Sequence, residues 1–554
     1  MEFISNSKNQ SDLFLASRKG QNAIAFLFLL FFFVFNVLSV QGKDKTYDEP
    51  VHYQYGKNIL NGDSTRFDDS KMPISAWNAL PAKVVEIIPF PDGLVKAYLP
   101  KLITARLMTT LFSVIVAFMV FYWARELYGF IPSLISIGLY ILDPNIIAHS
   151  QLVTTDIYVT GMILFSSYWL WKFAYSRKWQ DGIWFAIMLG IAQLTKYTAF
   201  SLYSLYAIAF MVYDWPSIKK GFETGRWAEV RGIMWQYVKY AIVVVVISVA
   251  IINIGFLFNR TFTSFSDYDF RSNLFKSIQS KTSFAVPVPY PYLEGLDWVL
   301  DRERTNTGFG GIYLLGELRF GKGFPGYYFI ASLLKVPIAT QIVLLAAFSV
   351  YLSDRDRREK FFSNEWFLLW LVLFYTIYFN FLYRAQIGIR YYLVVFPLLY
   401  VFAGGLFTNW RSFGWKQKWT VFTLSLYLIV SVISYFPYYI SYFNEIIWDR
   451  KMAYRYLADS NLDWGQDALI LSRFRVEHPD VHRAPEEPEL LTETTRYFVY
   501  VNQLVGITKD PQVYEWLRDN FEPVDMIAPS CLLFEITPEQ MQDLCQRTSY
   551  CTRE

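Results

Sequence analysis

The sequence has few of the residues that mark metal centres, redox sites and nucleotide-binding folds. Its 554 residues include four histidines and three cysteines, and neither residue type forms a metal-ligand spacing. No P-loop and no Rossmann glycine pattern occurs, so no motif indicates nucleotide binding. Cys531, Cys545 and Cys551 all lie near the C-terminus, which allows one disulfide and one spare thiol if that end faces an oxidising compartment.

Charged residues are also scarce. Asp, Glu, Lys and Arg make up 18% of the chain, and the net charge of +3 is too small to indicate a nucleic-acid partner. In their place, 54% of the residues are hydrophobic and 19% are aromatic, whereas soluble domains are about 45–50% apolar. The apolar residues lie in long blocks, so we expect an α-helical polytopic membrane protein with some soluble mass.

About eleven apolar blocks approach the length of roughly 20 residues that a membrane-spanning helix needs. The first follows Arg18 and Lys19 and has no clear small-residue cleavage site after it, so we expect a span and not a cleaved signal peptide. The fifth and sixth blocks are short and are compatible with a hairpin, which leaves the downstream topology unchanged. The predicted spans are 23–40, 102–123, 130–147, 157–171, 182–195, 198–213, 237–258, 327–351, 366–382, 391–407 and 419–436.

Basic residues occur on alternate connections, and Lys and Arg favour the cytoplasmic side of a membrane. We therefore expect a cytoplasmic tail over 1–22, a transmembrane domain over 23–436 and an extracytoplasmic C-terminal domain over 437–554. The transmembrane domain would carry extracytoplasmic loops over 41–101 and 259–326. The basic connections are those with Arg125, with Lys172, Arg177 and Lys178, with Lys219, Lys220, Arg226 and Arg231, with Arg355, Arg357, Arg358 and Lys360, and with Arg411, Lys416 and Lys418.

The region after the last span has the pattern of a small α/β domain. Two runs rich in β-branched and aromatic residues, 497–501 and 530–536, predict strands, and 466–475 and 537–546 predict helices.

Two adjacent carboxylates, Asp48 and Glu49, follow the first span directly, with His52 close behind. Taken alone, such a pair is usually a solvated loop that starts a helix, since Asp caps helices and Pro50 suits a first turn. The topology places the pair on the outer side, next to other charged residues, and this favours a catalytic carboxylate beside a membrane-buried pocket.

Ionisable residues at the ends of several spans gather on the same outer side. Each one alone is compatible with snorkelling or a single ion pair. Together they suit a phosphate-bearing lipid, because Lys and Arg bind phosphate and carboxylates act on a transferred group. An ion pathway would instead place carboxylates near the midplane. The residues are Arg106, Asp143, Asp156, Lys196, Lys335 and Arg390.

Several short motifs resemble those of one enzyme group. The sequence reads Tyr-Asp-Glu-Pro-Val-His over 47–52, Lys-Met-Pro-Ile over 71–74, Thr-Thr-Asp over 154–156 and Leu-Thr-Lys-Tyr over 194–197. This combination resembles the protein O-mannosyltransferase and aminoarabinose transferase group of the glycosyltransferase C superfamily. Segments 313–317, 442–445 and 459–467 are similar to those of bacterial members.

The resemblance implies a glycosyltransferase C-type fold and an inverting enzyme that moves a monosaccharide from a polyprenyl-phosphate donor to an extracytoplasmic protein, lipid or glycan. It implies Asp48 as the catalytic base, with Glu49 and Asp156 shaping the site. Some relatives hold a divalent metal, which makes His149 and Glu317 candidate ligands. The implied ligands of the donor phosphate are Lys71, Arg106, Lys196 and Arg390. Apart from the phosphate ligands, His52, Asp143, Glu317 and Lys335 are further candidate site residues.

Lys71 is a partial match, because relatives have a Lys or His before a Pro-Pro pair and this chain has Met72-Pro73. The chemistry itself needs cations to neutralise the phosphate leaving group and one carboxylate to accept the proton of the acceptor hydroxyl.

Two alternatives stay open. A transporter or flippase of a lipid-linked saccharide would need functional charges on both faces and no catalytic Asp48. An oligosaccharyltransferase or glycan ligase would share the architecture and differ in the size of the donor. We expect a bacterial inner membrane location with a periplasmic site, in contact with membrane lipids. The sugar and the acceptor are not indicated.

Overall fold

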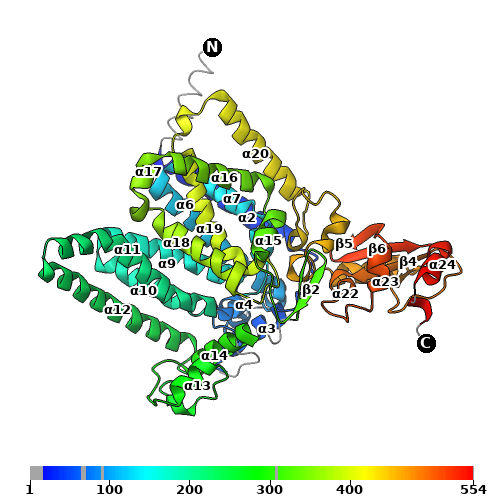
Figure 1. Cartoon of the computed structure of the whole chain (residues 1–554), viewed down its shortest axis with the longest axis horizontal. Helices are drawn as coiled ribbons and strands as arrows, with labels where there is room; N and C mark the ends of the chain where they lie inside the picture. Colours follow the sequence, from blue (N-terminus) through cyan, green and yellow to red (C-terminus); the bar gives the residue numbers. More distant parts are fainter. Residues whose placement is uncertain are drawn as a thin grey trace.

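Helices make up most of the chain, and the longer ones pack into one bundle (Figure 1). The computed structural model describes residues 17–63, 70–88, 91, 93–305, 310–548 and 550–552. Most of the predicted tail 1–22 and parts of the loops 41–101 and 259–326 therefore lie outside the described residues. The bundle helices are α2 (Arg18–Ser39), α6 (Leu102–Tyr128), α7 (Phe130–Ile141), α9 (Asp156–Ser176), α10 (Trp179–Ala192), α11 (Leu202–Glu223), α12 (Trp227–Gly255), α15 (Tyr327–Lys335), α16 (Ile338–Ser353), α18 (Trp366–Ile377), α19 (Phe396–Gly404) and α20 (Trp415–Ile433).

Helix α9 lies at the centre of the bundle, where it contacts α6, α10, α11, α18 and α19. It is apolar on all sides, as expected of a helix surrounded by others, and most of its residues are buried. Ser166 and Ser167 share hydrogen bonds with Tyr206 of α11, at 2.7 and 2.9 Å, and such interhelical bonds stabilise helix pairs in lipid. Because α9 begins at Asp156, this central position places that carboxylate inside the protein.

Several helices are apolar enough for a membrane, but the predicted number of about eleven spans is not confirmed. Among the described residues, four stretches have the length and hydropathy to cross a bilayer, or five if α15 and α16 form one span. The chain bends by 117° between these two helices, because Pro337 lacks the N–H needed to continue α15. Other predicted spans are shorter helices, and 391–407 begins as a 3₁₀ helix, η5 (Ile389–Val395).

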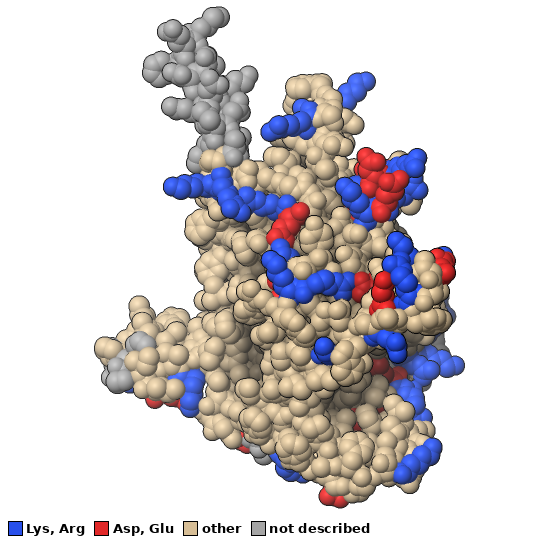
Figure 2. All heavy atoms as spheres, turned by 90° about the vertical axis from the view of Figure 1, so that its left-hand side faces the viewer, with Lys and Arg blue, Asp and Glu red and all other residues tan. Residues whose placement is uncertain are grey.

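One end of the bundle carries groups of Lys and Arg side chains. The turn between α11 and α12 and the short helix α17 (Arg355–Glu359) lie at the end away from the C-terminal strands (Figure 1). Figure 2 shows this end, where Lys and Arg side chains gather in groups. Two of the basic connections on which the orientation was predicted therefore share one end of the molecule.

Short helices in the loops occupy the opposite end. Helices α3 (Glu49–Leu60) and α4 (Ser75–Ile87) pack closely, since a Cβ added at Gly56 would lie 2.1 Å from the carbonyl oxygen of Ser75. This approach brings His52 Nδ1 to 3.4 Å from Ser75 Oγ. The other elements are α5 (Leu94–Tyr98), α8 (Pro144–His149), α13 (Asn273–Gln279), α14 (Tyr290–Thr305) and the hairpin β1 (Gly311–Leu314) and β2 (Glu317–Phe320).

The C-terminal region contains a four-stranded sheet in the order β3-β4-β6-β5. Strand β3 is parallel to β4, and the other pairs are antiparallel, with Tyr500 opposite Cys531. The runs expected to be strands correspond to β4 and β6; the domain boundaries stay predictions. The elements are α21 (Ala468–Glu477), β3 (Val481–Arg483), β4 (Thr495–Tyr500), α22 (Val501–Leu504), α23 (Glu515–Asn520), β5 (Asp525–Ala528), β6 (Cys531–Ile536) and α24 (Pro538–Arg547).

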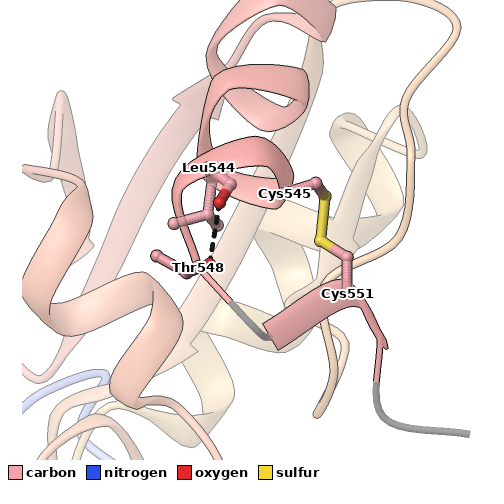
Figure 3. The surroundings of a disulfide bond; sticks show 4 residues. All are labelled: Leu544, Cys545, Thr548 and Cys551. Atoms are coloured by element: carbon pink, nitrogen blue, oxygen red, sulfur yellow. Dashed lines mark hydrogen bonds between the residues drawn. A yellow bond between two sulfur atoms is a disulfide. The ribbon is translucent and has the colours of Figure 1, made fainter.

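The structure pairs two of the three cysteines. Cys545 of α24 forms a disulfide with Cys551 (Figure 3). Cys531 is a free, buried thiol, in line with the expected single disulfide and spare cysteine.

Candidate active site

Asp48 contacts the guanidinium of Arg390, which lies 342 residues further along the sequence. It occupies the position before the first turn of α3, but its side chain caps no backbone N–H of that helix. Instead Arg390 donates a hydrogen bond from Nη1 to Asp48 Oδ2 at 2.9 Å. The Asp48 side chain is 25% exposed and that of Arg390 only 8%. The carboxylate is thus held by a buried guanidinium and still reaches solvent.

A second carboxylate and a second cation lie beside this pair. Lys196 Nζ is 2.8 Å from Asp156 Oδ1, and Arg390 Nη1 is 4.0 Å from Asp156 Oδ2. Lys196 also lies over the ring of Tyr391, 4.0 Å from its centre. The contact between α9 and η5 brings these side chains together. Asp48, Arg390, Asp156 and Lys196, called the charge cluster below, therefore alternate in sign.

The cations control the protonation of the loop residues. Burial acts to raise the pKa of Asp48, but the positive charges of Arg390 and Lys71 outweigh it and leave the pKa lowered. Burial and the charge of Lys71 lower the pKa of His52 to about 3. Asp48 is therefore an anion and His52 is neutral at neutral pH.

Glu49 and Arg106 bind each other and not the charge cluster. Arg106 donates to both Glu49 oxygens, from Nε at 2.8 Å and from Nη2 at 2.6 Å. Glu49 also accepts the backbone N–H groups of Thr46 and Val153, at 2.8 and 3.0 Å. Arg106 further donates to the carbonyls of Lys43 and Asp44. This buried pair joins the start of the loop to α6, and we propose a positioning role for both residues; the predicted contact of Arg106 with the donor phosphate stays an untested prediction.

Two further candidates form buried hydrogen bonds to other residues than the four of the cluster. Asp143 caps α8 by accepting the N–H of Asn145 at 2.7 Å, and it also accepts a hydrogen bond from Tyr400. Lys335 is buried and donates to the carbonyl of Ile440 at 2.8 Å and to that of Asn461.

The candidate metal ligands do not fit a metal site. Glu317 is exposed at the start of β2, where it pairs with Arg319 at 2.6 Å. His149 is buried, and its Nδ1 has no partner among the described residues. That described part of the chain contains no group of three or more His, Cys, Asp or Glu side chains placed to hold a metal. Metal dependence stays an untested prediction, and no step is derived through a metal.

The sequence reasoning missed two aromatic residues at the cluster. The guanidinium of Arg390 lies 4.0 Å from the ring centre of Trp464 and 5.2 Å from that of Tyr391. Trp464 belongs to the segment 459–467, which was singled out for its resemblance and not for its position. Tyr391 is adjacent to Arg390 in sequence, but no spacing signal indicated its contact with Lys196.

Residues 101–252 match the model of the dolichyl-phosphate-mannose-protein mannosyltransferase family. The predicted resemblance to the glycosyltransferase C superfamily is confirmed. The match includes Asp156 and Lys196 of the charge cluster and covers a minority of the chain. Asp48 and Arg390 lie outside it, so the structure joins the glycosyltransferase C-like segment to residues from both sides.

Two solved structures are similar to this glycosyltransferase C-like chain. The crystal structure of ArnT from Cupriavidus metallidurans bound to undecaprenyl phosphate is 11% identical with a TM-score of 0.48, and the alignment covers 75% of this chain and 64% of that one. The apo structure of the same protein is 12% identical with a TM-score of 0.32, over 94% and 99% of the two chains. The chain thus spans less than two thirds of the length of the first. No curated protein matches the sequence.

Proposed function

We propose that the chain is a glycosyltransferase that moves a monosaccharide from a polyprenyl phosphate to a hydroxyl group on the outer side of a membrane. The observation that carries this proposal is the contact between Asp48 and Arg390 beside Asp156 and Lys196. A partly exposed carboxylate held among cations is the arrangement that a base and a phosphate leaving group require. The family match over residues 101–252 supports the same reaction.

In the proposed reaction, Asp48 accepts the proton of the acceptor hydroxyl, and the hydroxyl oxygen bonds to the anomeric carbon. The bond from that carbon to the phosphate oxygen breaks, and its electron pair stays on the phosphate. This single displacement inverts the anomeric configuration. Asp48 is suited to the role because its lowered pKa keeps it ionised and its side chain reaches solvent.

Arg390, Lys196 and Lys71 are the proposed ligands of the phosphate. The Nε of Arg390 has no partner among the described residues, so the guanidinium keeps a donor after it binds Asp48. The Lys196 side chain is 23% exposed and is not enclosed by its pair with Asp156. Arg106 is left out of this set because Glu49 and two carbonyls occupy it.

The test is transfer in vitro by the purified full-length protein, using short-chain polyprenyl phosphates that carry different monosaccharides. Asp48→Asn should remove transfer while keeping the shape of the side chain. Asp44→Asn is the matched control, because among the described residues its side chain accepts one hydrogen bond, from the backbone N–H of Lys45, and Asn retains this acceptor. Full transfer by Asp48→Asn would refute the base assignment. Failure of the wild type with every monosaccharide donor would refute the proposed reaction and favour a transporter or a larger-glycan transferase.

The sidedness of the site belongs to the same proposal. Helix α3, which begins directly after Asp48, lies near the loop helices and toward the C-terminal region, whereas the α11–α12 turn and α17 lie at the other end of the bundle (Figure 1). By the preference of Lys and Arg for the cytoplasm, the cluster faces outward, which in a bacterial inner membrane is the periplasm. A cysteine at position 448, where Trp448 is 87% exposed, should react with an impermeant thiol reagent added from outside.

A further inference from the structure

Residues 459–467 join the two chain segments that supply Asp48 and Arg390, and they are called the bracket segment below. On the Arg390 side, the side-chain carbonyl of Asn461 accepts the N–H of Ile389 at 2.9 Å. The hydroxyl of Ser460 donates to the carbonyl of Ile387. A Cβ at Gly388 would lie 2.3 Å from Ser460 Oγ, so only glycine permits this approach at its φ of +145°.

On the Asp48 side, the bracket segment bonds to the chain just before the carboxylate. The N–H of Tyr47 donates to the carbonyl of Trp464 at 3.1 Å, and the N–H of Asp44 donates to that of Gln466 at 3.0 Å. The same few residues are therefore hydrogen-bonded to the backbone beside both members of the Asp48–Arg390 pair.

Trp464 adds a side-chain contact to this arrangement. Its ring centre lies 4.0 Å from the Arg390 guanidinium, and both residues are buried, at 6% and 8% exposure. Cation–π contacts are strongest when they are desolvated. The guanidinium has two carboxylates in reach, Asp48 at 2.9 Å and Asp156 at 4.0 Å. The indole face limits where it can move between them.

We propose that Trp464 is a positioning residue, which holds Arg390 against Asp48 and so keeps the carboxylate ready to accept a proton. This inference rests on the proposed function and extends it to the C-terminal region. Lys196 assists by neutralising Asp156, since its ammonium lies 2.8 Å from that carboxylate and weakens the pull of Asp156 on Arg390.

The C-terminal sheet supports the bracket segment at both of its ends. Asn502 of α22 accepts the N–H of Asp459 at 2.8 Å and donates to the carbonyl of Asp463 at 2.8 Å. Ser530, beside β6, donates to Asp467 at 2.7 Å. Asp459 has a positive φ of 56°, a conformation that costs energy outside glycine and is kept only when the surroundings impose it. The sheet is thereby coupled to the charge cluster through the bracket segment.

The experiment compares Trp464→Ala and Trp464→Phe with the wild type in the full-length purified protein. In Trp464→Ala the Arg390 guanidinium loses its contact with the indole ring and is no longer held against Asp48. The positive charge near Asp48 is then weaker, so the proton affinity of the Asp48 carboxylate rises. The acid limb of the pH profile of kcat/KM should move to higher pH, and kcat at neutral pH should fall at least tenfold with KM for the donor changed less than threefold. Trp464→Phe, which keeps an aromatic face, should restore most of kcat.

A readout without turnover separates this inference from the proposed function. Carbodiimides modify protonated carboxyl groups, so the pH midpoint of Asp48 modification, followed by mass spectrometry, reports its ionisation. The midpoint should rise in Trp464→Ala and stay near that of the wild type in Trp464→Phe. Trp448→Ala is the matched control, since Trp448 is 87% exposed in the same region.

Each outcome then has one meaning. An unchanged midpoint and an unchanged pH profile in Trp464→Ala would overturn the positioning role. A fall in kcat with no shift of either pH readout would show general damage and would also overturn it. If the wild type transfers no sugar from any donor, the proposed function fails, while the carbodiimide comparison still decides the role of Trp464.

Discussion

Glu49 and Asp48 are neighbours with the same chemistry, and the structure predicts opposite consequences of neutralising them. Glu49 is fully buried, and five donors reach its oxygens: Nε and Nη2 of Arg106, the N–H and hydroxyl of Thr46, and the N–H of Val153. In Glu49→Gln one oxygen becomes an NH₂ group, which faces donors and leaves the Arg106 charge uncompensated.

The magnitude follows from that burial. Breaking a buried ion pair by removing one partner costs about 3–5 kcal/mol. Asp48→Asn should cost only about 1 kcal/mol, the value of a typical hydrogen bond, because Asn still accepts from Arg390 and the Asp156 carboxylate remains 4.0 Å from that guanidinium. Glu49→Gln should therefore lower the free energy of unfolding strongly, whereas the Asp48→Asn protein should stay folded and lose transfer.

The assay is reversible unfolding in mixed micelles with increasing SDS, followed by tryptophan fluorescence. A double-mutant cycle with Arg106→Gln isolates the pair, because two partners of one buried ion pair are strongly non-additive. The double variant should be no less stable than either single variant. Equal stability of Glu49→Gln and Asp48→Asn, or additive effects of Glu49→Gln and Arg106→Gln, would refute the assignment of Glu49 as a positioning residue.

The other predictions concern ionisation, the metal candidates and the cysteines. Because the pKa of Asp48 is lowered, transfer should persist as the pH falls and disappear only below the ordinary Asp value of 3.8. His52→Ala should leave the pH profile of transfer unchanged, since the pKa of His52 is lowered to about 3. Burial raises the pKa of Asp459 to about 7, above its ordinary value of 3.8. The stabilisation from its protonated form is therefore complete below pH 3.8 and is lost as the pH rises through about 7. In Asp459→Asn the SDS concentration at the unfolding midpoint should no longer depend on pH between these two values. Glu317→Gln should leave transfer and metal response unchanged, because the Glu317 carboxylate is exposed and pairs with Arg319; a loss of transfer that added metal restores would contradict this. Cys531 should react with iodoacetamide only after unfolding, and mass spectrometry that finds it modified in the folded protein would contradict its burial.

The grouping of the charge cluster followed from topology. Asp48, Asp156, Lys196 and Arg390 were each placed on the outer side from the alternation of basic connections, and residues on one side of a bundle lie in one layer. The structure brings these four together. Their chemical roles stay predictions.

The division of labour within that layer was not predictable from the sequence. Arg106 and Arg390 are both arginines near the outer ends of predicted spans. The packing of α6 against the first loop nevertheless pairs Arg106 with Glu49. The contact of Trp464 with Arg390 depends on how the C-terminal sheet docks, a long-range arrangement with no local signature. The predicted span count is not confirmed, for a different reason: an apolar run in the sequence does not reveal a 117° bend or a 3₁₀ segment within it.

The alternating signs of the charge cluster carry a consequence for turnover. With Lys71 beside them, Asp48, Arg390, Asp156 and Lys196 total one positive charge, which a donor phosphodiester with one negative charge would balance. After transfer, the polyprenyl phosphate monoester carries nearly two negative charges, and the proton gained by Asp48 restores the balance. Once Asp48 gives up that proton, as its lowered pKa requires, one negative charge is in excess. In the proposed reaction, deprotonation of Asp48 thus repels the spent carrier, so the same event would regenerate the base and clear the site for the next donor.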